Sequence, residues 1–308
     1  MRLTPVRAWG KRVAVRTAKT VLTPQVIRRF FPSGLGCLWI RVPAAGVWPV
    51  RAGRFIAAQL NELPVEQAPP SVAVAWGKHP TLQVIHRALE DASRAAPPRL
   101  RRLERLLAET QRGQGGVVEQ RADLRGPRQR PLAVAQDAAV LSLPPLLRRL
   151  LYYLVRSLRP AVAVELGTAH GVSALHIATG MEELRHGHLH TIDGDPVRRA
   201  LALENLRAVL SSDRVTSHEG YFAKVLPSLL DRLGEPVDLA FDDGDHLPAS
   251  TLENFRLLFP RFRAGAVLLV DDINHPTGNV TAWRAIIAEP GVAAWVEVNT
   301  RLGICIKA

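Results

Sequence analysis

Short apolar runs alternate with amphipathic segments along the second half of the chain. The apolar runs are rich in β-branched residues and stop at acidic or turn-forming residues, which is typical of buried strands. Between these runs, apolar residues recur at three- and four-residue spacing and predict helices. Strands that alternate with helices predict a parallel sheet with helices on both faces. The predicted strands are residues 161–166, 188–193, 214–219, 237–243 and 266–272, and the following helices begin near Val172, Pro196, Phe222, Pro248 and Val280.

The end of the chain departs from this alternation. Residues 291–298 and 301–308 are apolar segments separated by Asn299 and Thr300, and they predict two strands joined by a tight turn. The predicted fold class is therefore α/β: a Rossmann-like, doubly wound and mostly parallel sheet of seven strands that closes with a C-terminal β-hairpin. The ligand of such a sheet lies beyond the carboxyl ends of the strands, near the point where the strand order reverses.

The first half of the chain has a different charge and pattern. The whole chain carries 40 Lys and Arg against 28 Asp and Glu, a formal net charge of +12, yet residues 1–60 contain no acid. Residues 79–96 and 97–113 have helical spacing, and a segment rich in Gly, Arg and Pro follows them. We therefore predict a basic, partly helical N-terminal region with a linker at residues 1–135, and a separate domain at residues 136–308.

The acid-free start of the chain allows several interpretations. It suits a poorly ordered basic arm, a transit-type address, contact with an anionic membrane surface or contact with nucleic acid. The apolar run around Trp39 is interrupted by Arg41 and lacks a small-residue cleavage site, so we expect neither a transmembrane helix nor a secretory signal. Cys37 and Cys305 cannot form a disulfide framework, which favours the cytoplasm, with association to a membrane surface left open.

A glycine turn follows the first predicted strand of the domain, with the sequence Gly167-Thr-Ala-His-Gly171. A dinucleotide site needs the pattern G-x-G-x-x-G, whose middle glycine lets the pyrophosphate approach the backbone. Ala169 stands at that middle position, and its methyl group would crowd a pyrophosphate. Glu165, just before the turn, would repel a diphosphate but suits the ammonium and sulfonium groups of S-adenosylmethionine (AdoMet). The turn therefore favours AdoMet over NAD.

Two further strand ends suit a nucleoside. Asp193 ends the second predicted strand, where its carboxylate can accept hydrogen bonds from both ribose hydroxyls. Because NAD sites place an acid there too, Asp193 supports a ribose without choosing between the two cofactors. Gly220 and Tyr221 follow the third predicted strand and could frame the adenine.

Acidic side chains also cluster after the last two parallel strands. Asp243 follows one strand, and Asp271 and Asp272 follow the next. Because adjacent parallel strands end at the same edge of a sheet, these carboxylates would converge and suit octahedral Mg²⁺. Such a metal would bind a substrate hydroxyl and lower its pKa. His246 is the candidate base for the hydroxyl proton; alternatively, Asp245 and His246 cap the next helix.

The segments "ELGTAHGVSALHIA", "TIDGDP", "VDLAFDDGDH" and "GAVLLVDD" resemble the successive motifs of class I AdoMet-dependent methyltransferases. The similarity is greatest to the small O-methyltransferases of the catechol and caffeoyl-CoA type and their bacterial relatives, and it covers roughly residues 136–308. The resemblance implies a cofactor site with Glu165, Gly167 and Ser173 near the methionine part of AdoMet and Asp193 on the ribose. The other candidate cofactor residues are Gly171, Gly220, Tyr221 and Asp243.

The same resemblance implies a metal held by the residues at the positions of Asp243, Asp271 and Asp272. The candidate catalytic residues are Asp243 and His246. Two positions depart from the family pattern. His246 stands where the family often has a lysine, and this chain has Asp-Asp where the family has Asp-Asn. These differences weaken both the implied need for a metal and the assignment of the base, compared with the binding of AdoMet.

The leading hypothesis is an AdoMet-dependent O-methyltransferase that acts on a small hydroxylated molecule, with assistance by Mg²⁺ left open. One alternative is an RNA-directed methyltransferase that docks through its basic N-terminal region, although the N-P-P-[FY] motif of base-methylating enzymes is absent after the fourth strand. Another is a non-catalytic module that binds AdoMet or a membrane surface. Contact of residues 1–60 with an anionic membrane or nucleic acid, and a homodimer, are left open as further partners.

Overall fold

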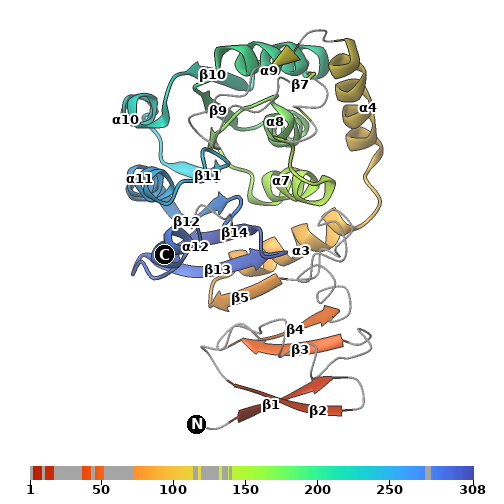
Figure 1. Ribbon diagram of the computed structural model, residues 1–308, viewed down its shortest axis with the longest axis vertical. Helices are drawn as coiled ribbons and strands as arrows, with labels where there is room; N and C mark the ends of the chain where they lie inside the picture. The colour runs from red at the N-terminus through yellow and green to blue at the C-terminus, as the bar shows by residue number, and fades with distance from the viewer. Residues whose placement is uncertain are drawn as a thin grey trace.

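The computed structural model describes residues 3–8, 11–16, 37–42, 46–51, 73–113, 117–118, 132–133, 138, 141–274 and 279–308. At its centre is an eight-stranded sheet (Figure 1). In spatial order its strands are β10 (Val215–Glu219), β9 (His188–Asp193), β8 (Val162–Leu166), β11 (Val237–Asp242), β12 (Phe262–Val270), β14 (Leu302–Lys307), β13 (Val292–Val298) and β5 (Ala73–Gly77). The strands from β10 to β12 are parallel to one another, whereas β14, β13 and β5 are antiparallel to their neighbours.

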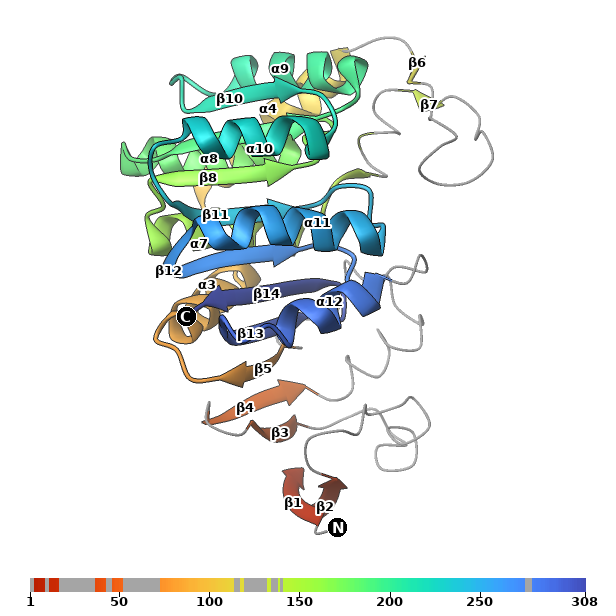
Figure 2. The same ribbon diagram turned by 90° about the vertical axis from the view of Figure 1, so that its left-hand side faces the viewer.

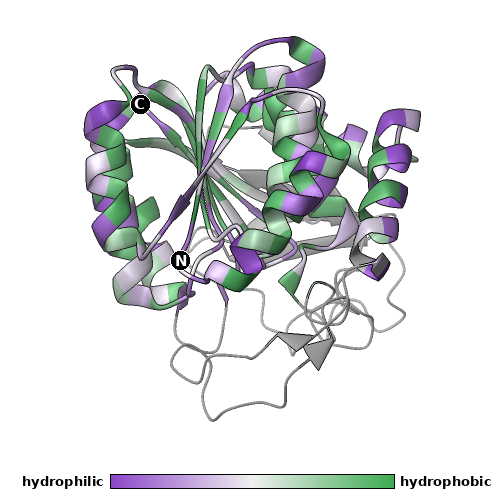
Figure 3. Ribbon diagram, turned by 90° about the horizontal axis from the view of Figure 1, so that it is seen from above, coloured by the Kyte–Doolittle hydropathy of each residue, from purple (hydrophilic) through white to green (hydrophobic). Residues whose placement is uncertain are grey.

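Helices cover both faces of this sheet. Figure 2 shows α10 (Phe222–Arg232), α11 (Pro248–Leu258) and α12 (Asn279–Ile287) on one face. The other face packs against α3 (Thr81–Ser93), α7 (Pro145–Leu158) and α8 (Val172–Leu184), while α4 (Pro98–Gly113) packs against α9 (Pro196–Val209). The short helix η2 (Phe259–Arg261) precedes β12. In Figure 3 both strands and helices mix apolar and polar positions, and this mixture is expected for helices with one face on the core. The predicted α/β fold with its C-terminal hairpin is confirmed.

The sheet has one strand more than the seven that the sequence predicts. β5 comes from the N-terminal region and pairs antiparallel with β13, where Trp76 lies opposite Trp295. Without β5, β13 would be an edge strand with unpaired backbone N–H and C=O groups. The two helices predicted in this region correspond to α3 and α4. The boundary at residue 136 stays a prediction, although β5, α3 and α4 all extend the sheet or its helical layers.

Further strands lie in the remainder of the N-terminal region. β1 (Leu3–Ala8), β2 (Lys11–Arg16), β3 (Cys37–Val42) and β4 (Gly46–Arg51) form a second sheet in the order β2-β1-β3-β4, and β6 (Val117–Val118) pairs with β7 (Leu132–Ala133). The side chains of residues 1–60 lie outside the described part of the chain, so the predicted membrane or nucleic-acid contacts fall there too. Among the described helices, none combines the length and the apolar character that crossing a membrane would require.

The strand order reverses between β8 and β11, whose carboxyl ends are in direct contact. The N–H of Asp243, which follows β11, donates to the carbonyl of Leu166 at 2.9 Å. A β-carbon on Gly167, which follows β8, would lie 2.1 Å from the carbonyl oxygen of Asp243. In doubly wound sheets this reversal is where ligands bind, so the contact between the two strand ends locates the candidate site.

We expect Gly167→Ala to destabilise the protein by about 3 kcal/mol. Gly167 has φ +93°, which residues with a β-carbon rarely adopt, and the added methyl group would overlap the backbone of Asp243. Gly234→Ala is the matched control, because Gly234 has φ +65° but nothing within 4 Å of the added carbon. That control should cost about 1 kcal/mol. Urea unfolding measures both variants, and equal losses would contradict a special role for the contact between the strand ends.

Candidate nucleotide-binding and acidic site

The glycine turn joins β8 to α8 at the reversal point. Gly167 and Gly171 have φ of +93° and +75°, and Ala169 between them has φ +43°. Gly171 is the N-cap of α8. Because glycine has no side chain, it cannot accept hydrogen bonds from the first N–H groups of that helix. A β-carbon on Gly171 would lie 3.1 Å from the β-carbon of Ala202 on α9. The turn is therefore confined between β11 and α9.

Asp193, at the end of β9, braces this turn. Its Oδ2 accepts the N–H of Ala169 at 2.7 Å, and its Oδ1 accepts the N–H of Asp195 at 2.7 Å. Burial raises the pKa of Asp193, and the two N–H groups oppose that shift. Each carboxylate oxygen can accept a further hydrogen bond, so these contacts leave Asp193 able to receive ribose hydroxyls. The contact with Ala169 was not predicted from the sequence.

Gly220 and Tyr221 lie beside Asp193. The N–H of Gly220 donates to the carbonyl of Asp193 at 2.9 Å. A β-carbon on Gly194 would lie 3.6 Å from the ring of Tyr221. Because Tyr221 is 58% exposed, its ring offers an aromatic surface next to the end of β9. This placement is compatible with an adenine beyond the ribose, and the adenine contact itself stays a prediction.

Glu165 is a buried acid beneath the turn. Its side chain has no exposed surface, and its Oε2 accepts the hydroxyl of Thr191 at 2.5 Å. Burial raises the pKa of Glu165 to about 7, while the hydroxyls of Ser173 and Thr191 act in the opposite direction. Ser173 is itself buried in the first turn of α8. A cation beside Glu165 would favour its charged form, whereas a phosphate would disfavour it.

A shallow recess that opens to solvent lies against the glycine turn. The turn, Asp243 and the segment before α7 form its walls. The sequence did not identify this last segment, because residues 141–143 carry no charge or motif that separates them from the helix they precede. The lining residues are Ala138, Leu141, Ser142, Leu143, Gly167, Thr168, Ala169, His170, Val172, Ser173 and Asp243.

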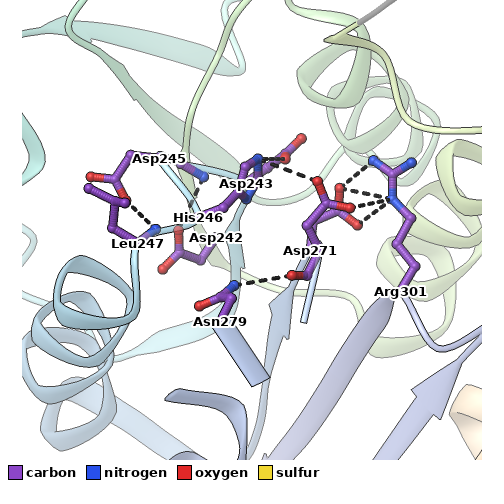
Figure 4. A network of polar contacts seen from close by, with 10 residues as sticks. Asp242, Asp243, Asp245, His246, Leu247, Asp271, Asn279 and Arg301 are labelled. Carbon is purple, nitrogen blue, oxygen red and sulfur yellow. Dashed lines mark hydrogen bonds and ion pairs between the residues drawn. The ribbon is translucent and has the colours of Figure 1, made fainter. Parts of the chain in front are cut away.

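The structure brings the predicted acids and His246 together after β11 and β12 (Figure 4). Nε2 of His246 lies 3.8 Å from Oδ1 of Asp243 and 3.6 Å from Oδ2 of Asp272. Burial raises the pKa of Asp243 well above its usual value; the charge of Asp271 adds to this shift and that of Arg301 opposes it. His246 is also buried.

Arg301, which was not predicted from the sequence, completes this cluster. It lies in the turn between β13 and β14, and its carbonyl accepts the N–H of Ile273 at 2.9 Å. Its Nε lies 2.9 Å from Oδ1 of Asp271, and its Nη2 lies 2.6 Å from Oδ2 of Asp271. The same Nε lies 3.2 Å from Oδ1 of Asp272. Burial lowers the pKa of Arg301, but its hydrogen bonds to Asp271 and the surrounding acids outweigh burial and raise it.

These contacts test whether the cluster suits Mg²⁺. Magnesium takes oxygen ligands at about 2.0–2.1 Å in an octahedral shell. Both oxygens of Asp271 are directed at Arg301, and Asp243 and Asp272 each have an oxygen near His246. Within the described residues, no group of three or more His, Cys, Asp or Glu side chains could hold a metal ion. The donor set therefore does not fit the predicted Mg²⁺, and that prediction is not supported.

Two more acids have structural contacts next to the cluster. Oδ1 of Asp245 accepts the N–H of Leu247 at 3.1 Å, yet the N-cap of α11 makes no side-chain capping bond. The alternative role of Asp245 and His246 as helix caps is thus limited to this one contact before α11. Oδ2 of Asp242 accepts the amide N–H of Asn254 at 3.1 Å, and burial raises the pKa of Asp242 to about 7.

The part of the chain that carries most of this site is similar in sequence to known proteins. Residues 164–273 match a family model described as a methyltransferase domain. A catechol O-methyltransferase from Niastella koreensis is 28% identical over 140 residues, which are 46% of this chain and 60% of that protein. A protein from Mycobacterium sp. (strain JLS) with a provisional O-methyltransferase name is 34% identical over 138 residues, which are 44% of this chain and 59% of that protein. The chain thus spans less than two thirds of the length of the curated relatives it matches.

A solved structure extends the similarity in fold over a longer stretch. The O-methyltransferase TomG from Streptomyces achromogenes, involved in tomaymycin synthesis and determined in complex with SAM, matches with a TM-score of 0.51 and 20% identity. The match covers 75% of this chain and 100% of that chain. The resemblance to class I methyltransferases that the sequence shows is therefore confirmed for the fold and for the matched domain.

We expect Glu165→Gln to change how the free energy of unfolding depends on pH in the ligand-free protein. The folded protein binds the proton of Glu165 with a pKa of about 7, against 4.5 for an unperturbed Glu. The stability that Glu165 contributes is therefore complete at acidic pH and is lost as the pH rises through about 7. Relative to the wild type, the variant should gain up to about 3 kcal/mol between about pH 5 and pH 8 in urea unfolding.

A second buried acid and a control variant bear on this measurement. Burial also raises the pKa of Asp242 to about 7, so Glu165→Gln should reduce the pH dependence without abolishing it. Glu219→Gln changes an exposed acid at the end of the neighbouring strand β10 and should keep the wild-type dependence. A Glu165→Gln curve that runs parallel to the wild-type curve over this range would contradict the raised pKa.

Proposed function

We propose that this chain transfers the methyl group of AdoMet to an oxygen of a small hydroxylated molecule. The observation that carries the proposal is the glycine turn after β8, which Asp193 braces from β9 and Glu165 underlies. This turn lies where the strand order reverses, within the segment that matches a methyltransferase domain. The relatives named as O-methyltransferases support oxygen as the methyl acceptor.

The charges around the turn favour AdoMet over a dinucleotide. Glu165, Asp193 and Asp243 place three carboxyl groups around the turn and its recess. A diphosphate would add like charge to this group, whereas AdoMet brings a sulfonium and an ammonium. The N–H of Ala169, at the position where a dinucleotide site has its middle glycine, is already bonded to Asp193. Both features work against a pyrophosphate.

The proposed cofactor position follows the order of the strand ends. Asp193 would bind the ribose hydroxyls, with Gly220 and Tyr221 beside the adenine. Gly167, Gly171 and Ser173 would surround the methionine part, above the buried Glu165. The methyl group would then point toward the recess, which Asp243 and the segment before α7 also line.

The proposed chemistry uses His246 as a general base. As the hydroxyl oxygen of the acceptor forms its bond to the methyl carbon, the carbon–sulfur bond breaks and its electron pair stays on sulfur, giving S-adenosylhomocysteine. Nε2 of His246 accepts the hydroxyl proton, and the carboxylates 3.6 and 3.8 Å away stabilise the imidazolium that forms. Holding the acceptor oxygen in line with the carbon–sulfur bond supplies the remaining rate enhancement.

Magnesium is not part of this proposal, because the oxygens that would bind it face Arg301 or His246. The alternatives of an RNA-directed enzyme and of a non-catalytic membrane-surface module depend on residues 1–60, whose side chains lie outside the described part of the chain. Those alternatives, and the homodimer, therefore stay predictions.

We expect Asp193→Ala to weaken AdoMet binding at least about 10-fold, because the variant loses two hydrogen-bond acceptors for the ribose and the brace on Ala169. Isothermal titration calorimetry measures the dissociation constant. Glu219→Ala is the matched control, since Glu219 ends the neighbouring strand β10 and is paired in register with Asp193 but is exposed. Equal affinity in wild type and Asp193→Ala would remove the ribose assignment.

We expect His246→Gln to lower kcat about 100-fold or more and to leave the dissociation constant of AdoMet unchanged, as loss of a general base should. The assay measures S-adenosylhomocysteine formed with a panel of small phenols and catechols. His188→Gln is the control, because His188 begins β9 at the opposite end of the sheet and should keep full activity. Wild-type turnover in His246→Gln would show that another group takes the proton.

A further inference from the structure

The acidic cluster formed by Asp243, Asp271 and Asp272 contains a cation that the chain itself supplies. The guanidinium of Arg301 meets the carboxylate of Asp271 through two parallel contacts, Nε to Oδ1 at 2.9 Å and Nη2 to Oδ2 at 2.6 Å. Such fork-to-fork pairs are among the strongest hydrogen-bonded ion pairs in proteins. Asp271 has no exposed surface, and in Figure 4 it lies between Arg301 and Asp243. Solvent therefore cannot reach the carboxylate of Asp271 in its ion pair with Arg301.

The backbone around Arg301 fixes this cation beside the acids. The N–H of Arg301 donates to the carbonyl of Val298 at 3.1 Å, which closes the turn of the hairpin. Its carbonyl accepts the N–H of Ile273 at 2.9 Å. Since Ile273 directly follows Asp272, this second bond ties the hairpin turn to the loop that carries both acids. Arg301 is thus held at its backbone and at its guanidinium.

A divalent cation and Arg301 would compete for the same oxygens. To bind a metal, Asp271 would have to give up both contacts with Arg301, and the guanidinium would then lie next to a like charge. An arginine also keeps its proton at every working pH, so its charge cannot be removed to make room. Nε of Arg301 lies 3.2 Å from Oδ1 of Asp272 as well, so one side chain forms ion pairs with two acids.

We propose that Arg301 takes the place of a divalent cation in this cluster, holding Asp271 and Asp272 in position and keeping metal ions out. In the proposed methyl transfer Arg301 is a positioning residue: it fixes Asp272, whose Oδ2 lies 3.6 Å from Nε2 of His246. The exclusion of metal ions does not rest on the proposed methyl transfer, because it concerns only the charges and contacts of the cluster.

Titration of the full chain with Mn²⁺, followed by the electron paramagnetic resonance signal of the free ion, tests this proposal. The wild type should show no saturable binding below about 1 mM. Arg301→Gln removes the charge and should bind one Mn²⁺ at least about 10-fold more tightly. Arg301→Lys keeps a cation at this position and should behave as the wild type. Arg263→Gln, which breaks an arginine–carboxylate pair with Asp238 elsewhere in the sheet, is the matched control and should gain no binding.

A second substitution assigns the gained metal ion to the cluster. Adding Asp271→Asn to Arg301→Gln should abolish the Mn²⁺ binding, and added Mg²⁺ should compete for it in the single variant. If Arg301→Gln folds only in the presence of Mg²⁺, that dependence supports the proposal. Where the variant does not fold at all, the wild-type titration decides.

Two results would overturn the proposal: saturable submillimolar Mn²⁺ binding by the wild type, or binding by folded Arg301→Gln that is no tighter than that of the wild type. Neither AdoMet nor an acceptor is needed for the titration. A failure here therefore leaves the proposed methyl transfer standing, and a wild type without transferase activity leaves the metal result unaffected.

Discussion

The close contact between the carboxyl ends of β8 and β11 is the constraint on which the site depends. Only a glycine can follow β8, because a β-carbon there would overlap the carbonyl oxygen of Asp243. The contact brings the glycine turn and the acid after β11 to the same recess. A hydrogen bond of 2.9 Å from the N–H of Asp271 to the carbonyl of Asp242 continues the arrangement to β12. One backbone packing thus places a nucleotide-type turn and an acidic cluster side by side.

The sequence predicts most of the domain because its signals are local. Buried parallel strands such as β8 and β11 are rich in apolar residues, so their ends, and with them Asp243, can be located from the sequence alone. Asp193 ends the more polar strand β9, which the alternation of strands and helices locates. Arg301 could not be found in this way. The antiparallel pairing of β14 with β12 places Gly303 opposite Val270, which brings Arg301 beside the acids, and no local pattern states which strand the hairpin joins. β5 and the segment before α7 were missed for the same reason, since their roles depend on contacts distant in sequence.

The buried acids of the site are compensated in two different ways. Asp271 faces the full positive charge of Arg301. Glu165 is bonded to hydroxyl groups, and Asp193 accepts N–H groups of the backbone. Neutral donors reduce the cost of burying a carboxylate but do not cancel its charge, and burial accordingly raises the pKa of both Glu165 and Asp193. The turn therefore retains a demand for positive charge, whereas on the hairpin side of the site Arg301 meets part of that demand.

The acids at the glycine turn and the acids beside Arg301 thus differ in how their charge is compensated. For this reason the number of acids alone does not predict where a cationic ligand binds. All the carboxylates lie at one edge of the sheet, and Glu165 still raises the pKa of Asp243 across the boundary between them. A cationic ligand gains most where the described residues offer a buried acid no charged partner, which is beside Glu165. Its binding would also stabilise the folded state, because the carboxylates it neutralises are the ones whose burial costs free energy without it. Because Arg301 already pairs with the acids after β12, a cationic cofactor would gain more by binding at the turn. The charges of the cluster after β12 are then those of its own side chains.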